Sequence, residues 1–217
     1  MKSDTQLQHD VLAELKWQPS VNAAHIGVTA KDNAVTLTGQ VDHYTEKMAA
    51  QNAAKGVYGV QAVANDIVVE LPGSSRRTDQ DIAAAALSAL TWDFEVPTDT
   101  IKVMVDNGYV TLEGAVDWQY QKDSATRCVQ YLMGVKAIIN SITIKPTAKW
   151  IDVTNKIEDA FRRSADLDAR RIDVETHNGK VTLTGSVSSW KERNDAVTAA
   201  WAAPGVTSVS DKLAVVL

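Results

Sequence analysis

The chain has 217 residues, of which 45% are hydrophobic and 23% charged, and its formal net charge is −5 at pH 7. This composition is typical of an ordinary folded protein in water and excludes a disordered or fibrous chain. No stretch approaches the length of about 18 apolar residues that a transmembrane helix requires, so no transmembrane segment is predicted.

Localisation follows from the start of the chain and from its cysteine content. The first residues lead into a polar amphipathic segment without the apolar stretch of an export signal. Cys128 stands alone, which excludes an internal disulfide and fits a reducing compartment. As written, the chain is expected in the cytoplasm, or in the periplasm if a signal peptide was removed from it.

A five-residue motif recurs along the chain and predicts three tandem units. Each motif ends in a glycine, and a Gly-Val pair follows 20 residues later: Gly39 with Gly59-Val60, Gly114 with Gly134-Val135, and Gly185 with Gly205-Val206. We therefore divide the chain into residues 1–71, a linker at 72–76, and residues 77–146 and 147–217.

Each unit opens with a helical pattern and continues into a hairpin. The apolar residues expected to face the core of the first helices are Leu7, Val11, Leu12 and Leu15; Ile82, Ala86, Leu87 and Leu90; and Val153, Ile157, Ala160 and Phe161. The hairpin turns are predicted at Asp32-Asn33, Asn107-Gly108 and Asn178-Gly179, because these residue types tolerate the positive φ of a two-residue turn. The recurrent motif forms the return strand.

A second helix and a third strand complete each unit. Small residues dominate the predicted inner face of the second helix, including Ala50, Ala125 and Ala196. Cys128 falls on this face and is interpreted as a buried, unreactive thiol. A right-handed crossover places the third strand parallel to the second. The predicted fold class is α+β, with three tandem α-β-β-α-β units, each a small mixed three-stranded sheet with two helices packed on one face.

This pattern resembles the BON family, named for bacterial OsmY and nodulation proteins. The resemblance covers nearly the whole chain three times, and the residues that carry it are Gly39, Gly59, Gly114, Gly134, Gly185 and Gly205. It implies a bacterial stress or envelope-associated module that binds phospholipid or other partners and has no known catalysis of its own. We interpret all six glycines as determinants of the fold. Gly39, Gly114 and Gly185, which end the recurrent motif, are expected to leave room for a packed helix.

The residues show no pattern of an enzyme, a cofactor site or a metal site. His9, His25, His43 and His177 share neither equivalent positions nor a metal-ligand spacing. The acidic pairs Asp79/Asp81, Asp93/Glu95 and Asp166/Asp168 are interpreted as helix-start and loop carboxylates rather than catalytic pairs. No catalytic residue, metal or cofactor is therefore predicted.

The candidate ligand-binding residues lie in the third unit. They are four arginines, in a unit that also contains Trp150 and Trp190: Arg162, Arg163, Arg170 and Arg171. Near an anionic bilayer they supply at most roughly 4 kcal/mol, and Asp166, Asp168 and Asp173 lie among them. The alternative is that the arginines stabilise the helix end and pair with these aspartates.

Three hypotheses about function stay open. The first is a non-enzymatic protein that contacts anionic phospholipid peripherally, or a protein partner. The second is a cytoplasmic sensor of a small cation such as potassium, and the third is an oligomeric scaffold that uses sheet edges or Trp17 and Trp92. Nucleic acid is not predicted as a partner, because no unit has a basic excess.

Overall fold

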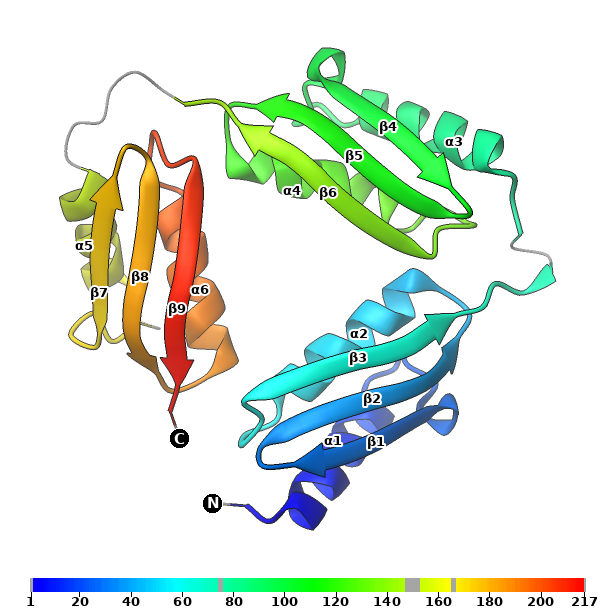
Figure 1. Ribbon diagram of the computed structural model, residues 1–217, viewed down its shortest axis with the longest axis horizontal. Helices are drawn as coiled ribbons and strands as arrows, with labels where there is room; N and C mark the ends of the chain where they lie inside the picture. The colour runs from blue at the N-terminus through cyan, green and yellow to red at the C-terminus, as the bar shows by residue number, and fades with distance from the viewer. Residues whose placement is uncertain (1, 74–75, 147–152, 165–166, 217) are drawn as a thin grey trace. The chain divides into compact units, whose positions relative to one another are not determined.

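The computed structural model describes residues 2–73, 76–146, 153–164 and 167–216. It contains three repeats with the same order of elements, α-β-β-α-β, each with its own three-stranded sheet (Figure 1). The predicted fold class is therefore confirmed.

The first repeat begins with a capped helix. Ser3 precedes the helix and its hydroxyl accepts a hydrogen bond from the main-chain N–H of Gln6. The elements of this repeat are α1 (Asp4–Trp17), η1 (Ala23–His25), β1 (Ile26–Lys31), β2 (Ala34–Val41), α2 (Tyr44–Gly56) and β3 (Ala62–Val69).

The second repeat begins with a capping box, in which Thr78 and Asp81 each bond the main-chain N–H of the other. Its elements are α3 (Asp79–Trp92), η3 (Thr98–Thr100), β4 (Ile101–Asp106), β5 (Tyr109–Val116), α4 (Gln119–Val129) and β6 (Ala137–Ile144).

The third repeat has the same order without a 3-10 helix among its described residues. Its elements are α5 (Val153–Arg163), β7 (Ile172–His177), β8 (Lys180–Val187), α6 (Trp190–Trp201) and β9 (Ser208–Val215).

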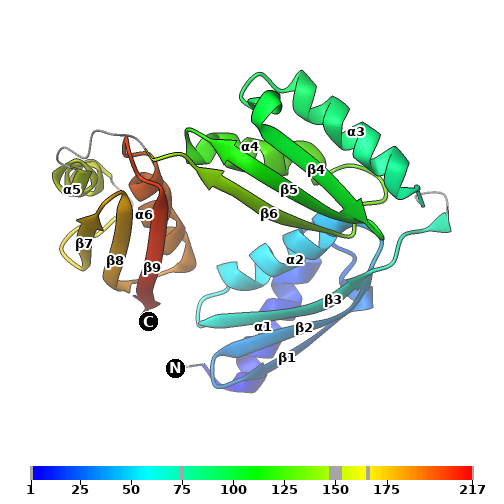
Figure 2. The same cartoon turned by 45° about the horizontal axis from the view of Figure 1, so that its top comes forward.

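The sheets have the predicted topology. In the first repeat β1 pairs antiparallel with β2, and β3 pairs parallel with β2 on its other side. The third repeat has the same pairing. Both helices of a repeat cover one face of its sheet (Figure 2). At each hairpin turn the first central residue is Asp32, Asn107 or Asn178 with φ of 50, 51 or 47°, as a tight two-residue turn requires.

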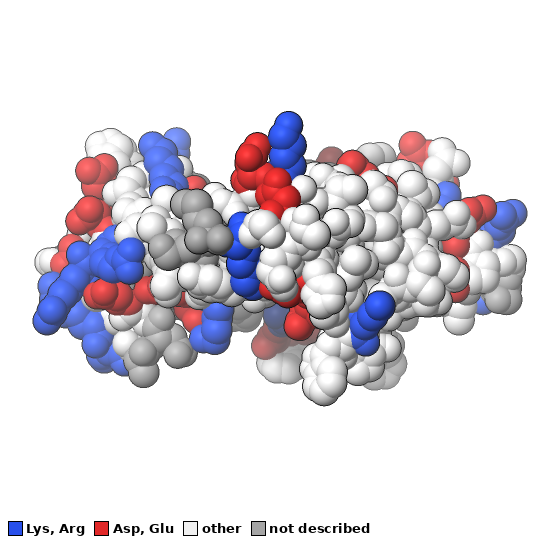
Figure 3. All heavy atoms as spheres, turned by 90° about the horizontal axis from the view of Figure 1, so that it is seen from below, with Lys and Arg blue, Asp and Glu red and all other residues white. Residues whose placement is uncertain are grey.

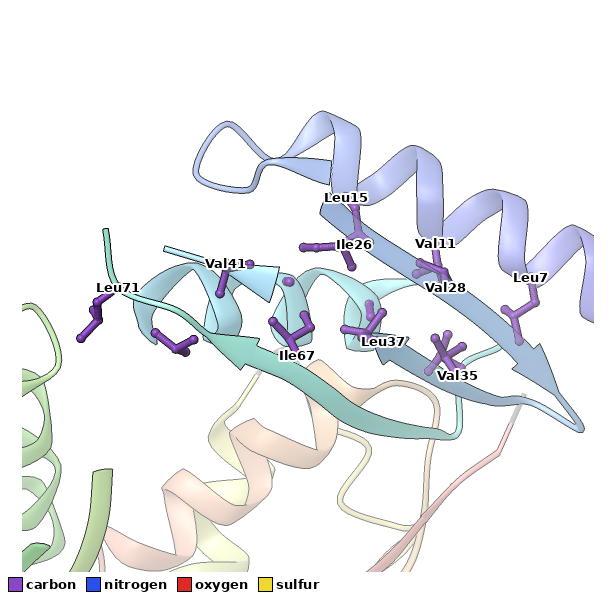
Figure 4. Close-up of a cluster of buried hydrophobic side chains, with 14 residues drawn as sticks. Leu7, Val11, Leu15, Ile26, Val28, Val35, Leu37, Val41, Ile67 and Leu71 are labelled. Atoms are coloured by element: carbon purple, nitrogen blue, oxygen red, sulfur yellow. The ribbon is translucent and has the colours of Figure 1, made fainter. Parts of the chain in front are cut away.

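The core of each repeat lies between its helices and its sheet. In the first repeat Leu7, Val11 and Leu15 point from α1 onto Val28, Val35 and Leu37 of the sheet, and all are buried (Figure 4). The spacing of four residues along α1 matches the helical period and keeps these three side chains in one row.

Three predicted core positions on the first helices are not fully buried. Leu87 is 56% exposed, because it lies about 100° around the helix from the buried Ala86. Leu12 of α1 and Ala160 of α5 are half-buried, each at the border of the buried row of its own helix. The buried row of α3 is therefore the narrower set Ile82, Ala86 and Leu90.

The motif glycines are required by the close approach of the main chain that enters the first strand, and not by a packed α-helix. Gly39, Gly114 and Gly185 have φ of 127, 143 and 116°. A Cβ on Gly114 would lie 2.1 Å from the carbonyl oxygen of Thr100, just before the neighbouring strand β4. The expectation that these glycines make room for a helix is therefore wrong. It is the second glycine that meets a helix: a Cβ on Gly134 would lie 2.7 Å from Ile82 Cδ1.

An edge clamp, made of a helix cation and a strand Asn or Asp, covers the last strand of each repeat. In the second repeat Lys122 Nζ donates to the carbonyl oxygen of Ile142 at 2.7 Å. Asn140 Oδ1 accepts from the N–H of Ile142 at 3.0 Å, and its amide donates to the carbonyl of Lys122. Both main-chain groups of Ile142 on the free edge of β6 are thus occupied.

The first repeat contains the same clamp, and the third contains a variant in which the helix cation bonds the strand carboxylate and not a main-chain carbonyl. In the first, Lys47 and Asn65 bond the carbonyl oxygen and the N–H of Ile67. In the third, Asp211 accepts from the N–H of Leu213, and Arg193 Nε donates to Asp211 at 2.7 Å.

Candidate functional site

The repeats differ at one equivalent place, the helix-to-strand loop that joins the first helix to the first strand. Counted from the last residue of the helix, these loops comprise residues 17–25, 92–100 and 163–171, of which 165 and 166 lie outside the described residues. The helix ends there at Trp17, Trp92 and Arg163.

The loop of the first repeat exposes one tryptophan. Trp17 is 81% exposed. Glu46 on α2 holds the loop in place, because its Oε1 accepts a hydrogen bond from the N–H of Asn22 at 2.7 Å.

The loop of the second repeat exposes two aromatic side chains on a braced main chain. Trp92 is 87% and Phe94 is 96% exposed. The acidic residues between and after them turn inward: Asp93 accepts from the N–H of Glu95 and from the thiol of Cys128. Glu95 pairs with Arg127 at 3.1 Å. The loop therefore presents an aromatic pair to solvent while its carboxylates stay engaged with the protein.

Sequence reasoning identified Trp92 but missed Phe94. The signal was the alternation of aromatic and acidic residues from Trp92 to Glu95. Interpreting Asp93 and Glu95 as loop carboxylates gives no indication that the aromatic residue between them is exposed.

The four candidate arginines of the third repeat do not form one cationic cluster. Arg162 pairs with Asp159 at 3.0 Å and with Glu158 at 3.4 Å on its own helix. Arg171 donates to the hydroxyl of Ser186 at 3.0 Å. Arg163 and Arg170 have no acidic side-chain partner among the described residues.

The surface around these arginines is mixed in charge. Figure 3 shows Lys and Arg atoms gathered at the left, over the third repeat, with Asp and Glu atoms between them. Two of the acidic residues near the arginines are Asp168 and Asp173, both exposed. Asp166 and Trp150, which the sequence placed in the same region, lie outside the described residues. The structure thus leaves two arginines available to an external anion, where the sequence suggested four.

A buried glutamate supports the loop of the third repeat. Glu192 is 7% exposed and lies on α6 at the position equivalent to Glu46. Its carboxylate accepts from the N–H of Asp168 at 3.0 Å and from the N–H and hydroxyl of Ser188. Burial alone would raise the pKa of Glu192, but these hydrogen bonds and the nearby Arg171 hold the pKa below its usual value.

Cys128 is half-buried rather than fully buried. Burial, with the hydrogen bond to Asp93 and the charge of that carboxylate, raises the pKa of Cys128 to about 12. The thiol is therefore protonated near neutral pH, which agrees with an unreactive role and opposes nucleophilic chemistry.

The remaining acidic candidates have structural partners. Asp79 accepts hydrogen bonds from the N–H groups of Asn107 and Gly108 at 2.8 and 2.9 Å, which fastens the hairpin turn to the start of α3. Asp4 bonds the N–H of Asp32 in the same way in the first repeat.

The described residues contain no group of three or more His, Cys, Asp or Glu side chains arranged to hold a metal ion. None of the helices among them has the length and hydrophobicity of a membrane span.

Comparison with known proteins identifies relatives of this chain. It is 31% identical to osmotically-inducible protein Y of Escherichia coli K12 over 146 residues. The aligned region covers 65% of this chain and 73% of that protein. It is 32% identical over 129 residues to the outer membrane lipoprotein DolP of Haemophilus influenzae, which covers 58% of this chain and 64% of that protein. It is 30% identical over 146 residues to the 21 kDa hemolysin of Actinobacillus pleuropneumoniae, which covers 64% of this chain and 75% of that protein.

The family model of the BON domain matches the chain three times, at residues 3–70, 78–146 and 152–216. These matches coincide with the three α-β-β-α-β repeats that the structure describes. The chain therefore belongs to the BON family and carries three tandem copies of its domain.

Proposed function

We propose that this protein is a non-enzymatic, stress-related binding protein that attaches peripherally to anionic phospholipid surfaces through its helix-to-strand loops. The observation that carries the proposal is the aromatic pair of the second repeat, Trp92 and Phe94, which is almost fully exposed on a braced loop. Aromatic side chains of this kind favour the interface between water and lipid.

The third repeat adds electrostatic attraction to the same type of loop. Arg163 and Arg170 are exposed and have no acidic side-chain partner among the described residues. Two such cations near an anionic surface contribute roughly 2 kcal/mol at low salt, and this attraction weakens as salt screens it. Attachment therefore needs both the aromatic and the cationic loops.

The relatives support this proposal through their names. One is an outer membrane lipoprotein, another is a hemolysin, and a third is osmotically inducible. As part of the proposal, we extend to this chain the osmotic response named for one relative and the membrane association named for another.

Co-sedimentation with vesicles tests the proposal. The full chain should pellet with vesicles of equimolar phosphatidylglycerol and phosphatidylcholine and remain in solution with phosphatidylcholine alone. Replacing Trp92 and Phe94 by Ala should reduce pelleting, and replacing Arg162, Arg163, Arg170 and Arg171 by Ser should reduce it further.

A charge-matched control distinguishes the arginines from net charge. Changing the exposed Lys31, Lys102, Lys180 and Lys212 to Ser removes the same number of cations, four, from other parts of the repeats and should leave pelleting nearly unchanged. Equal pelleting with neutral and anionic vesicles, or full pelleting of both loop variants, would rule out the proposed attachment.

A further inference from the structure

The third repeat contains a groove between its two helices. The groove has a volume of about 300 Å³ and is bordered by Lys156 and Arg163 of α5 and by small residues, Ala160, Ala199 and Ala203. This volume is near the lower limit of small-molecule sites, which range from about 300 to 1,000 Å³.

Comparison of the repeats explains why the groove exists. Two positions after the second helix carry Val57 and Tyr58 in the first repeat and Leu132 and Met133 in the second, but Ala203 and Pro204 in the third. The small residues remove side-chain volume next to α5, so the groove follows from substitutions specific to this repeat.

In the first repeat the equivalent place is filled by the protein's own side chains. The ammonium of Lys2 lies 5.4 Å from the centroid of the Tyr58 ring and pairs with Asp10 at 2.7 Å. Lys156 occupies the position of Asp10, which reverses the charge at this point.

The groove combines a cationic border with an apolar floor. Lys156 and Arg163 are seven residues apart on α5, which is close to two helical turns, so both lie on the same side of the helix. Both are exposed, and neither has an ion-pair partner in the ranges 2–73, 76–146, 153–164 and 167–216. Asp159, which also borders the groove, is paired with Arg162.

These features favour a ligand with one anionic group and one hydrocarbon chain. The two cations suit a carboxylate, and the alanine floor offers apolar contact without polar side chains that would remain unpaired. The volume suits a single chain of medium length and is too small for the two chains of a phospholipid.

We propose that the third repeat binds one molecule of a medium-chain fatty acid as its carboxylate. The carboxylate lies between Lys156 and Arg163, and the alkyl chain lies over Ala160, Ala199 and Ala203. This site takes a dissolved ligand molecule and not a bilayer surface, although Arg163 takes part in both proposed contacts.

Nuclear magnetic resonance of the full chain with dodecanoate, below the concentration at which it forms micelles, tests the site. Saturable shifts are expected for amides of α5 and for the turn after α6. Dodecanol and dodecyltrimethylammonium have the same chain without the negative charge and should bind at least about fivefold more weakly, because they lose the ion pairs.

Two variants test the two halves of the site. Ala203→Leu places the residue of the second repeat in the groove and should weaken binding by more than about tenfold through lack of space. Lys156→Ala, which also copies the second repeat, should weaken it about two- to fivefold, as expected for the loss of one exposed ion pair. Since Lys156 is exposed, this variant keeps the test valid even if Ala203→Leu does not fold.

A third variant separates this site from the proposed lipid attachment. Changing Arg170 and Arg171 to Ser should weaken pelleting with anionic vesicles and leave dodecanoate binding unchanged, because neither residue borders the groove. Shifts spread over all three repeats, dodecanol binding as tight as dodecanoate binding, or unchanged binding by Lys156→Ala would overturn the proposal.

Discussion

Cys128 shows how a single neighbour sets the chemistry of a side chain. Its thiol donates to Asp93 at 3.1 Å, and burial together with this carboxylate raises its pKa to about 12. The same hydrogen bond fixes the loop that carries Trp92 and Phe94. The chemistry of the cysteine and the geometry of the aromatic pair are therefore linked through one carboxylate.

We expect Cys128 to react slowly with thiol reagents. With a pKa near 12 instead of 9, the thiolate fraction at pH 8 falls about a thousandfold, and reaction with a disulfide reagent slows accordingly. Asp93→Asn removes the negative charge beside the thiol and should accelerate the reaction of Cys128 with the disulfide reagent. The rate is measured from the absorbance of the thiol that the reagent releases. Urea-unfolded protein is the control, and equal rates for folded and unfolded chains would contradict the assigned environment.

Glu192 makes the stability of the third repeat depend on pH. Its pKa in the folded protein lies below the ordinary value of 4.5, so the carboxylate stabilises the fold at neutral pH and this contribution is lost as the pH falls below 4.5. Glu192→Gln should lower the free energy of unfolding by about 1–3 kcal/mol at pH 7, and by less near pH 4.

Urea unfolding at both pH values measures this difference. Glu175→Gln, an exposed change on β7, serves as the control and should have little effect at either pH. A Glu192→Gln effect that stays constant or grows as the pH falls would show that the carboxylate is not held in its charged form.

At the scale of elements, the edge clamp determines what the sheets can do. An unprotected edge strand offers its N–H and C=O groups to other chains. The clamp occupies these groups at Ile67 and Ile142 and the N–H at Leu213. It therefore opposes the hypothesis of a scaffold that joins through this edge of the sheet.

Removing the clamp of the second repeat should cause self-association. β6 (Ala137–Ile144) has no charged residue, whereas β3 contains Asp66 and β9 contains Asp211 and Lys212. The double change Lys122→Ala and Asn140→Ala frees the edge of β6 and should cost about 1–2 kcal/mol of stability as well.

Sedimentation velocity over a range of concentrations measures the association. Lys102→Ala with Ser141→Ala changes the exposed surface of the same sheet without touching the clamp, and should show the same size distribution as the wild type. A clamp-free variant that keeps its fold and shows the same size at every concentration would exclude this role.

The elements also show where sequence reasoning succeeds and where it stops. The Asn-Gly turns and the alternating apolar strands are local signals, and they predicted the fold of every repeat. Leu87 was misplaced, because apolarity alone does not distinguish a core row from its border. The clamp was missed because Lys122 and Asn140 lie on different elements, although their equivalents recur in each repeat.

The candidate site was predicted only in part for a related reason. The four arginines stand close together in the sequence, but Arg162 and Arg171 have protein partners in the structure. Such pairings depend on the direction of each side chain, which neighbouring positions in a sequence do not determine.

At the scale of the whole molecule, the first and third repeats have separate cores. Buried residues of the first repeat, from Leu7 to Leu71, form one cluster, and those of the third, from Val153 to Leu213, form another. We therefore expect that one repeat can unfold while the buried contacts within another repeat stay intact.

Gly114→Val tests this independence. The new side chain would lie 2.1 Å from the carbonyl oxygen of Thr100 at a φ of 143°, so the second repeat should lose about 3 kcal/mol or more. Hydrogen exchange should become faster throughout the second repeat and stay unchanged in the cores of the first and third.

Gly56→Ala is the matched control for this glycine substitution. A Cβ at Gly56 meets no atom within 4 Å, and alanine suits the end of α2, so stability should stay equal or rise by up to about 1 kcal/mol. Faster exchange in all three repeats of Gly114→Val would show that their stabilities are coupled.

The edge clamp has a consequence for how such a chain can arise. Tandem copies of one domain meet each other at an effective concentration in the millimolar range, so similar open edges would join within the chain before any partner arrived. Because each copy carries its own clamp, gene duplication can lengthen the array without creating misfolded intermediates between copies. The number of domains is thus free to vary, while their surface loops can differ from copy to copy.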